Sequence, residues 1–319
     1  MSLVALPVII PILGAGLTLT LSRWLQVQRV VSFLVLVATM VASIALLVEV
    51  EADGIAALNL GGWPAPVGIT LVADLAATGL LVVSVAVILL VHLYSIGQGC
   101  DTDRPRVFHP VYLVLCAGVA MSFLPGDFFN LFVAFEVMLI ASYVLITLGA
   151  GQQRIRAGMT YVVINLLAST MLLTAVGLVY AATGTVNMAD LVTKFEALPE
   201  SSRIGFGGLL LAVFAIKAAI FPFFFWLPDS YPTAPISVTA VFAGLLTKVG
   251  IYTMIRTTTI LDLDELQPLL LWAAGITMII GVVGAIAQDD MKRILSFHIV
   301  SQIGYMLMGL AIYTVAGLA

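Results

Sequence analysis

The sequence predicts an all-α fold, a polytopic transmembrane bundle of about ten helices, and three observations support this. Of the 319 residues, 62% are hydrophobic and only 9% are charged, whereas soluble domains average about 25% charged residues. The mean hydropathy is +1.17. The apolar residues recur in runs of about 20, the length of helix that crosses roughly 30 Å of hydrocarbon. This composition excludes a soluble globular enzyme, and it excludes a disordered chain, which requires low hydrophobicity and high charge.

Ten apolar runs follow one another, joined mostly by short connections. They cover residues 3–22, 30–50, 72–96, 108–125, 128–149, 157–182, 205–227, 234–258, 268–287 and 293–315. The first run has no basic segment before it and no A-x-A cleavage site, so we expect an uncleaved first helix. The longest connections, 51–71 and 183–204, are too small to fold as soluble domains. They contain Gly and Pro, and we expect a short interfacial helix over Met188–Leu198.

The seventh run contains a proline at depth. Pro222 lies five residues after Lys217, and Pro228, Pro232 and Pro235 follow it. Proline removes a backbone donor and breaks or kinks a helix. The last three prolines are placed to make the turn into the next run, whereas Pro222 lies deep enough to interrupt the helix itself. We therefore expect a broken helix near Pro222, as in transporters whose unwound backbone lines an ion path.

The basic residues predict the orientation of the chain, because cytoplasmic loops are enriched in Lys and Arg. When ten spans alternate, eight basic residues fall on one side: Arg23, Arg29, Arg104, Arg106, Arg154, Arg156, Lys292 and Arg293. Only Lys194, Arg203 and Arg256 fall on the other side, which is rich in acids. This distribution places the N-terminus outside and the basic loops in the cytoplasm.

Three charged residues lie inside predicted spans: Glu136, Lys217 and Lys248. A charge at the centre of a spanning helix costs about 2.5–3.5 kcal/mol on insertion scales. We therefore expect these residues to face the bundle interior, to pair with one another, or to border water. One interpretation is a structural ion pair of Glu136 with either lysine. The second lysine would then lack a carboxylate, and a buried lysine of this kind is tolerated when neutral. Such a lysine can exchange protons near neutral pH, so the alternative interpretation is proton transport.

We expect different locations and roles for the three histidines. His298 lies near the start of the last run, among Ser296, Ser301 and Gln302. It is either a hydrogen-bonded core residue or a proton relay. We expect His92 and His109 to be surface groups near the cytoplasmic interface.

Several classes of site are excluded or unsupported. The net charge of −4 offers no basic patch for nucleic acid. Two cysteines, Cys100 and Cys116, are too few for a structural zinc site or an iron–sulfur cluster, and we expect both to be ordinary core or surface residues. No P-loop or dinucleotide-binding fingerprint occurs. We therefore expect no metal and no cofactor, and energy supplied by an ion gradient or by a partner.

Four segments together resemble a known family. They are SFLPGDFFNLFVAFEVMLIASYVLI, FAIKAAIFPFFFWLPDSYPTAP, GLLTKVGIY and QDDMKRILSFHIVSQIGYM. They resemble the proton-translocating subunits shared by respiratory complex I and Mrp-type cation/proton antiporters. The first, third and fourth segments are most similar to the D subunits of Mrp-type multisubunit Na⁺/H⁺ antiporters. The resemblance runs from about residue 107 to the end, in order.

The resemblance implies roles for particular residues. Glu136 matches the family's glutamate in the fifth helix, and Lys217 matches its partner lysine in the broken seventh helix. Lys248 matches the lysine of the eighth helix, which continues a hydrated path along the membrane midplane. His298 matches the polar position in the tenth helix. The resemblance thus implies that these residues carry protons.

The resemblance also implies a division of the chain. Residues 1–106 would be a three-helix lead-in, 107–258 the first five-helix repeat, and 259–319 the start of a second, inverted repeat. The family pattern continues beyond the tenth span, so the second repeat is cut short here. We expect a fragment of a longer subunit.

The function expected from the resemblance is that of a transporter subunit rather than an enzyme. It would be a multi-pass protein of the bacterial cell membrane, exchanging protons for a monovalent cation, Na⁺, together with other membrane subunits. Two alternatives remain. The chain could belong to a redox-driven proton pump such as complex I or a membrane-bound hydrogenase, or it could be a scaffold whose charges serve packing alone.

Overall fold

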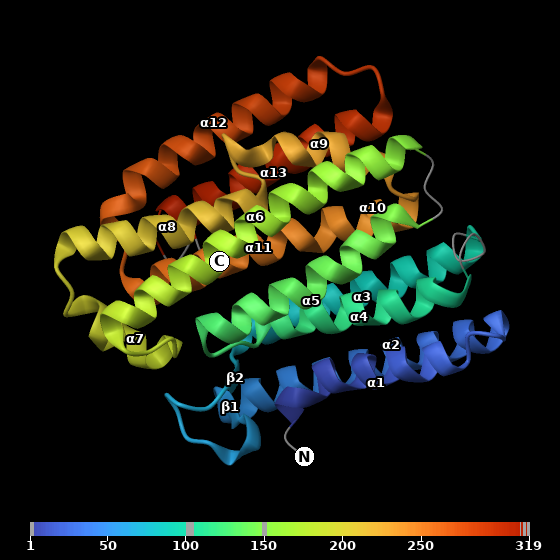
Figure 1. The fold of residues 1–319 in the computed structure, drawn as a ribbon, viewed down its shortest axis with the longest axis horizontal. Coiled ribbons are helices and arrows are strands. Elements are labelled where there is room, and N and C mark those ends of the chain that lie inside the picture. Colours follow the sequence, from blue (N-terminus) through green and yellow to red (C-terminus); the bar gives the residue numbers. More distant parts are fainter. Residues whose placement is uncertain (1–2, 100–104, 149–151, 313, 315–316, 318–319) are drawn as a thin grey trace. The chain divides into compact units, whose positions relative to one another are not determined.

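The computed structural model describes residues 3–99, 105–148, 152–312, 314 and 317 (Figure 1). Cys100 and Arg104 lie outside these described residues. The chain divides into two compact units. Unit 1 comprises Met1–Ile155 and Ala234–Gly244, and unit 2 comprises Arg156–Thr233 and Leu245–Ala319.

Unit 1 is a bundle of long helices with one small hairpin. Its helices are α1 (Leu6–Thr20), α2 (Leu25–Asp53), α3 (Leu75–Gly97), α4 (Pro105–Phe123), α5 (Phe128–Thr147) and the short α10 (Ile236–Val241). Helix α4 packs against α1, α2, α3 and α5, and α10 packs on α3. Helix α4 is therefore the central element of this unit, and its inward residues, such as Leu113, Cys116 and Ala120, are fully buried.

The connection after α2 contains a hairpin that the sequence did not predict. Strands β1 (Ala56–Asn59) and β2 (Thr70–Ala73) pair antiparallel, with Ala56 opposite Ala73. Strand β2 also bonds the turn before α5, since Val72 N–H donates to Leu124 O at 2.8 Å and Gly126 N–H donates to Thr70 O at 2.8 Å. The two strands lack the alternating apolar pattern of a long strand, so their pairing with each other is visible only in the folded chain.

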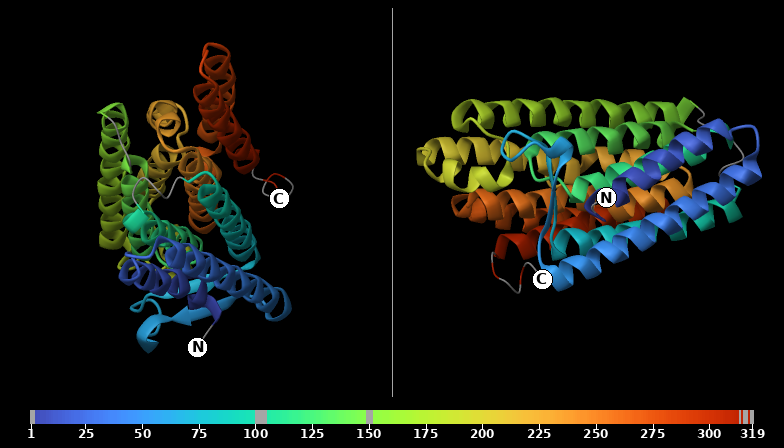
Figure 2. Two further views of the ribbon diagram at one scale, coloured as in Figure 1. Left: turned by 90° about the vertical axis from the view of Figure 1, so that its right-hand side faces the viewer. Right: turned by 90° about the horizontal axis from the view of Figure 1, so that it is seen from below.

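Unit 2 contains the later helices. They are α6 (Gln152–Thr183), most of which belongs to this unit, α7 (Met188–Glu196), α8 (Glu200–Ala218), α9 (Trp226–Ser230), α11 (Thr247–Leu261), α12 (Gln267–Ile286) and α13 (Met291–Ile312). Helices α12 and α13 form an antiparallel pair, visible in Figure 2. They approach closely at Gly281, where an added Cβ would lie only 2.5 Å from Ser301 N. Small residues permit such contacts between membrane helices.

Polar side chains define several helix starts. Asp74 accepts from Ala77 N–H at 2.8 Å at the start of α3, and Asp127 accepts from Asn130 N–H at 2.6 Å at the start of α5. Asn187 accepts from the N–H groups of Ala189 and Asp190 at the start of α7. These caps satisfy backbone donors that have no partner within the helix. Helix α7 occupies most of the segment predicted as a short helix.

The predicted fold class is confirmed. Within the described residues, ten helical segments are long and apolar enough to cross a membrane. The chain is a multi-pass membrane protein. Several boundaries differ from prediction. For example, α2 and α6 extend beyond their apolar runs, to Leu25–Asp53 and Gln152–Thr183, because the polar residues at their ends continue the helix past the apolar stretch.

Candidate functional site

Lys217 lies in the last turn of α8 and is almost completely buried. Its exposed fraction is 4%, and its Nζ donates a hydrogen bond to Ser169 Oγ of α6 at 3.0 Å. A charged side chain in hydrocarbon is costly and faces the protein interior. Lys217 satisfies this expectation, and Ser169 is a partner that the sequence did not reveal. Serines in spanning helices commonly bond the carbonyl one turn earlier, so the sequence offers no signal for this role.

The helix carrying Lys217 ends one residue later, and the predicted break is present. Ala219 adopts the left-handed conformation, with φ of 61°. Its N–H donates to Ile216 O at 3.2 Å, and Ile220 N–H donates to Ala215 O at 2.9 Å. This pair of bonds is a Schellman motif, which terminates α-helices. The interruption therefore begins three residues before Pro222, and Pro222 prevents the helix from resuming directly.

The backbone groups freed by this interruption find partners in unit 2. Phe221 N–H donates to Thr277 Oγ1 of α12 at 3.1 Å. Trp226 Nε1 of α9 donates to Ile216 O at 3.0 Å. Irregular backbone at membrane depth is tolerated only where protein or water satisfies it. Side chains from two other helices, α12 and α9, thus stabilise the interrupted backbone through hydrogen bonds.

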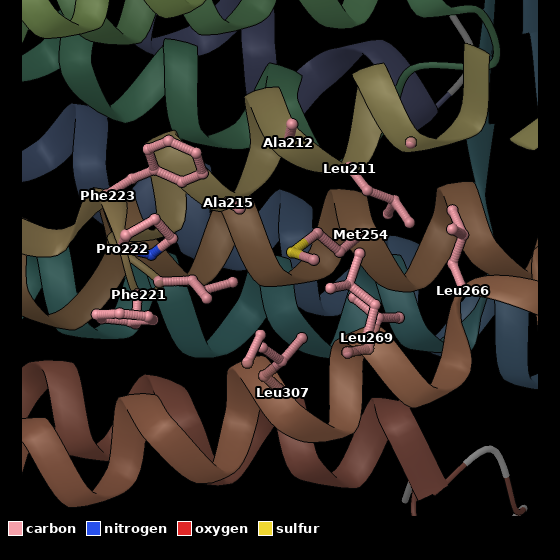
Figure 3. Close-up of a pocket in the computed structure, with 14 residues that line it drawn as sticks. Leu211, Ala212, Ala215, Phe221, Pro222, Phe223, Met254, Leu266, Leu269 and Leu307 are labelled. Carbon is pink, nitrogen blue, oxygen red and sulfur yellow. The ribbon is translucent and has the colours of Figure 1, made fainter. Parts of the chain in front are cut away.

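An apolar cavity of about 160 Å³ lies beside the break (Figure 3). Phe221, Pro222 and Phe223 line it together with Leu211 of α8 and Leu269 of α12. Its lining offers no charged or hydroxyl side chain. None of these lining side chains can bind a proton, so the cavity provides only apolar space next to the interrupted segment.

Lys248 lies on α11, which packs directly against α8. It is half-buried and follows a π-helical turn, Phe242–Leu246. Such turns often occur at functional sites. A Cβ on Gly250 would lie 2.9 Å from Ala218 N, so the two helices touch beside Lys217. Unit 2 therefore brings Lys217 and Lys248 onto adjoining helices, each within two residues of a close contact between those helices.

Glu136 lies midway along α5, in unit 1, and is half-buried. Its Oε1 atom is buried and has no hydrogen-bond partner among the described residues. Buried polar atoms require a partner or water. Glu136 belongs to a different unit from Lys217, Lys248 and His298, and its pairing with a lysine stays a prediction.

The start of α5 is a second polar position that the sequence analysis missed. Asp127 and Asn130 are 5% and 3% exposed, and both keep a buried side-chain atom, Oδ2 and Nδ2, without a partner in the described part of the chain. Burial raises the pKa of the Asp127 carboxyl, although hydrogen bonds from the N–H groups of Asn130 and Phe129 lower it in part. The capping motif itself was the signal that could have identified this position.

The histidines do not all match expectation. His298 is exposed on α13 in the described structure, while its neighbours Ser296 and Ser301 are buried. The expectation that His92 and His109 are surface groups is wrong. Both are fully buried in unit 1, because α2, α3 and α4 enclose them.

The basic residues at the start of α13 also have structural contacts. Arg293 forms an ion pair with Asp229 of α9 at 3.0 Å, and Lys292 Nζ donates to Pro232 O at 3.2 Å. These contacts join the start of α13 to the segment that follows the helix break. No group of three or more metal-ligating side chains occurs within the described ranges.

Comparison with protein families gives a match over most of the chain. The model described as "NADH:quinone oxidoreductase/Mrp antiporter, TM" matches residues 125–319. A protein of Alkalihalophilus pseudofirmus, named as the D subunit of a Na(+)/H(+) antiporter, is 46% identical, over 100% of this chain and 65% of its own length. A Bacillus subtilis protein of the same name is 40% identical, over 99% of this chain and 65% of its own length.

Comparison with solved structures finds chains of the same fold. A chain of the Mrp complex from Dietzia sp. DQ12-45-1b superposes with a TM-score of 0.94 at 34% identity, covering 100% of this chain and 60% of that one. A chain of a membrane-bound sulfane sulfur reductase, described as an archaeal respiratory membrane complex, gives 0.91 at 26% identity, covering 97% and 65%. The present chain thus spans about two thirds or less of the length of each of these relatives.

Proposed function

The chain belongs to the NADH:quinone oxidoreductase/Mrp antiporter transmembrane family, and from this we propose that it is a proton-translocating subunit of a multisubunit Na⁺/H⁺ antiporter. It would act as a secondary transporter component rather than an enzyme. Its partners would be other membrane subunits, as in the complex to which the Dietzia relative belongs. We place it in the bacterial cell membrane with the N-terminus outside, on the basis of its Lys and Arg distribution.

The observation that carries the proposal is the position of Lys217. Lys217 is 4% exposed, lies one residue before the end of α8 and donates to a serine hydroxyl. Such a lysine is costly to keep in a membrane. Packing alone would be served as well by an apolar side chain. A residue that must gain and lose a proton inside the bilayer has a reason to remain a lysine.

The mechanism proposed has two steps. First, a proton binds Lys217, and the Glu136 carboxylate stabilises the ammonium form when the two lie close. The Coulomb energy between such charges changes several-fold with spacing at low effective dielectric, so separation of the pair releases the proton. Second, Lys248 receives the proton through water and passes it along the midplane, with His298 as a further proton carrier. In this scheme Pro222 and the Ala219 turn give the Lys217 backbone freedom to move.

The proposed organisation follows the repeats of the family. Residues 1–106 form a lead-in, 107–258 a first five-helix repeat, and 259–319 the beginning of the second. The adjoining positions of Lys217 and Lys248 on α8 and α11 support one continuous path within the first repeat.

The test is cation-induced proton movement in everted vesicles of an antiporter-deficient host that expresses the complete operon. A preformed pH gradient is followed by dye fluorescence upon addition of Na⁺ and then K⁺. We expect Na⁺ to dissipate the gradient without electron donors, and Lys217→Ala to abolish this response at normal expression. Lys194→Ala, which replaces an exposed lysine on α7, is the matched control and should retain it. Exchange that persists in Lys217→Ala would overturn the mechanism.

A redox-driven proton pump is the second candidate. The family description includes NADH:quinone oxidoreductase, and the sulfane sulfur reductase relative is a respiratory complex. Failure of Na⁺ to act on assembled wild type, with neighbouring genes for iron–sulfur or flavin subunits, would favour it. A scaffold role instead predicts that Glu136→Gln preserves both assembly and transport.

A further inference from the structure

We propose that Ser32, His92 and His109 form a buried site that binds one proton, in the N-terminal helices and apart from Glu136, Lys217 and Lys248. The three polar atoms form a closed triangle. Ser32 Oγ lies 3.0 Å from His92 Nε2 and 3.1 Å from His109 Nδ1, and the two nitrogens are 3.2 Å apart. Each edge is a hydrogen-bond distance.

The triangle is built by three helices of unit 1. Ser32 comes from α2, His92 from α3 and His109 from α4, and all three side chains are fully buried. The two rings meet edge to face, with centroids 5.3 Å apart, and the Tyr112 ring lies 5.3 Å from that of His92. Packing therefore holds both imidazoles in fixed positions rather than letting them reach water.

Counting hydrogens identifies the vacant proton position. The Ser32 hydroxyl donates its hydrogen to Arg29 O at 3.1 Å, so its lone pairs are left to accept from the rings. At 3.2 Å, one ring nitrogen donates to the other. The single lone pair of the accepting nitrogen, which holds this hydrogen bond, is the position that can take a further proton. A proton added there gives two N–H groups, and Ser32 Oγ can accept from both.

On the three helices that build the triangle, the described charged side chains nearest to it in sequence are Arg29 of α2 and Arg106 of α4. Arg29 is half-buried on α2, one turn from Ser32, and Arg106 of α4 is exposed. Tyr112 donates its hydroxyl to Ile88 O, and Cys116 lies a turn further along α4. The described residues of α1 and α10, the other helices in this region, carry no titratable side chain.

The acids of the surrounding helices are remote along their axes. Glu49, Glu51 and Asp53 of α2 begin 17 residues after Ser32, or about 26 Å along a helix. Asp74 is 18 residues from His92 on α3, or about 27 Å. Helix α5, which packs on α4, carries Glu136 and Tyr143.

The donor set selects the ligand. Metal ions are usually held by three or more His, Cys, Asp or Glu side chains, and no such group occurs within the described residues. A single proton adds one charge, which two imidazoles and a hydroxyl can share. Once two N–H groups face each other, the direct contact between the rings is lost. Proton binding would therefore loosen the contact of α3 with α4, which makes this contact sensitive to pH.

The test benefits from the small number of histidines in the sequence. In His298→Gln, the full chain retains only His92 and His109. With ¹⁵N-labelled histidine and the chain in lipid nanodiscs, solid-state NMR measures the protonation of each ring against pH. We expect a nitrogen–nitrogen correlation between the two rings that disappears as one proton is taken up. Adding His92→Gln should shift the titration midpoint of His109 by about one pH unit or more, as for coupled groups.

The control is Ser95→Ala on the same helix as His92. The Ser95 hydroxyl is buried and donates to the His92 carbonyl at 2.7 Å, within its own helix. Its loss should leave both midpoints unchanged, whereas Ser32→Ala should move them. Two rings that never take up a proton while the chain stays folded would overturn the proposal, and so would independent midpoints. The His298→Gln spectrum alone decides this if a further variant fails to fold. None of these readouts depends on cation transport.

Discussion

At the scale of single residues, the charges within the spans are accommodated differently. Lys217 is nearly excluded from the surface and bonds Ser169, while Lys248 and Glu136 are half-buried. An ammonium group that is buried needs acceptors for its hydrogens. The hydroxyl of Ser169 therefore has a definite energetic role, although it is one of several serines within apolar spans.

Replacing Ser169 with Ala tests this role. We expect the free energy of unfolding to fall by about 1–3 kcal/mol, because a buried donor loses an acceptor. Thr170→Ala is the matched control, since this exposed hydroxyl bonds its own helix at Leu166 O, and its effect should stay within about 0.5 kcal/mol. Unfolding in mixed micelles measures both. Equal losses for the two variants would contradict the role given to Ser169.

The Asp190–Lys194 pair of α7 makes a pH-dependent contribution. The hydrogen bond from Lys194, at 2.7 Å, is the main cause of a lowered pKa of the Asp190 carboxyl. The unfolded carboxyl has a pKa of about 3.9. A lowered folded pKa means that the stabilisation is fully present above about pH 4. It is lost as the pH falls through the folded value.

Asp190→Asn should therefore lower the melting temperature at pH 7 but not well below pH 3. Melting curves of the two chains across this pH range measure the difference. In a Lys194→Met background the same substitution should show no such pH dependence, as a double-mutant cycle requires. If Asp190→Asn still lowered the melting temperature at the lowest pH, this would show that loss of the ion pair is not the cause.

At the scale of elements, the contact of α8 with α11 determines where the two lysine-bearing helices meet. It depends on Gly250, whose missing side chain leaves room for the Ala218 backbone. The interruption after Lys217 depends on the Ala219 turn and on bonds from Thr277 and Trp226. A spanning helix is thus divided by its neighbours as well as by proline.

Gly250→Ala should destabilise the chain by about 1–3 kcal/mol, the usual cost of overpacking. The new Cβ would lie 2.9 Å from Ala218 N, so α11 must shift away from α8. Gly275→Ala on α12 is the control, because its Cβ would meet nothing within 4 Å. It should stabilise by up to about 1 kcal/mol through helix propensity. If the free energy of unfolding changed in the same direction in both variants, this would contradict the close contact between α8 and α11.

At the scale of the whole molecule, the ten candidate spans of the described residues and the unequal distribution of basic residues predict how the chain crosses the membrane. The connection that contains α7 follows the sixth span, and the connection between α12 and α13 follows the ninth. With the N-terminus outside, these two connections lie on opposite faces. The positive-inside rule predicts that the second lies in the cytoplasm.

Cysteine labelling tests this orientation. In a chain with Cys100 and Cys116 replaced by Ser, Lys194→Cys should react with a membrane-impermeant maleimide in intact cells. Asp289→Cys should react only after permeabilisation. Both native side chains are exposed, so access depends on the face of the membrane alone. The reverse pattern would place the N-terminus in the cytoplasm.

Features that depend on local chemistry could be predicted from the amino-acid sequence. Spans follow from continuous apolar runs, since backbone hydrogen bonds in lipid must be satisfied within each segment. The break near Pro222 follows from the missing donor of proline. The family followed from four motif segments that the match over residues 125–319 confirms. The charges at 136, 217 and 248 stood out because apolar surroundings make them costly.

Which polar groups meet is visible only in the folded chain. The partner of Lys217 is 48 residues away, the imidazoles of His92 and His109 meet across two helices, and the β1–β2 hairpin is fixed by the turn before α5. Membrane helices lack a strong alternation of apolar and polar faces, because lipid and core are both apolar. The sequence therefore cannot indicate which face is buried. That is why His92 and His109 were placed at the surface, and why their burial appears only when α2, α3 and α4 are packed together.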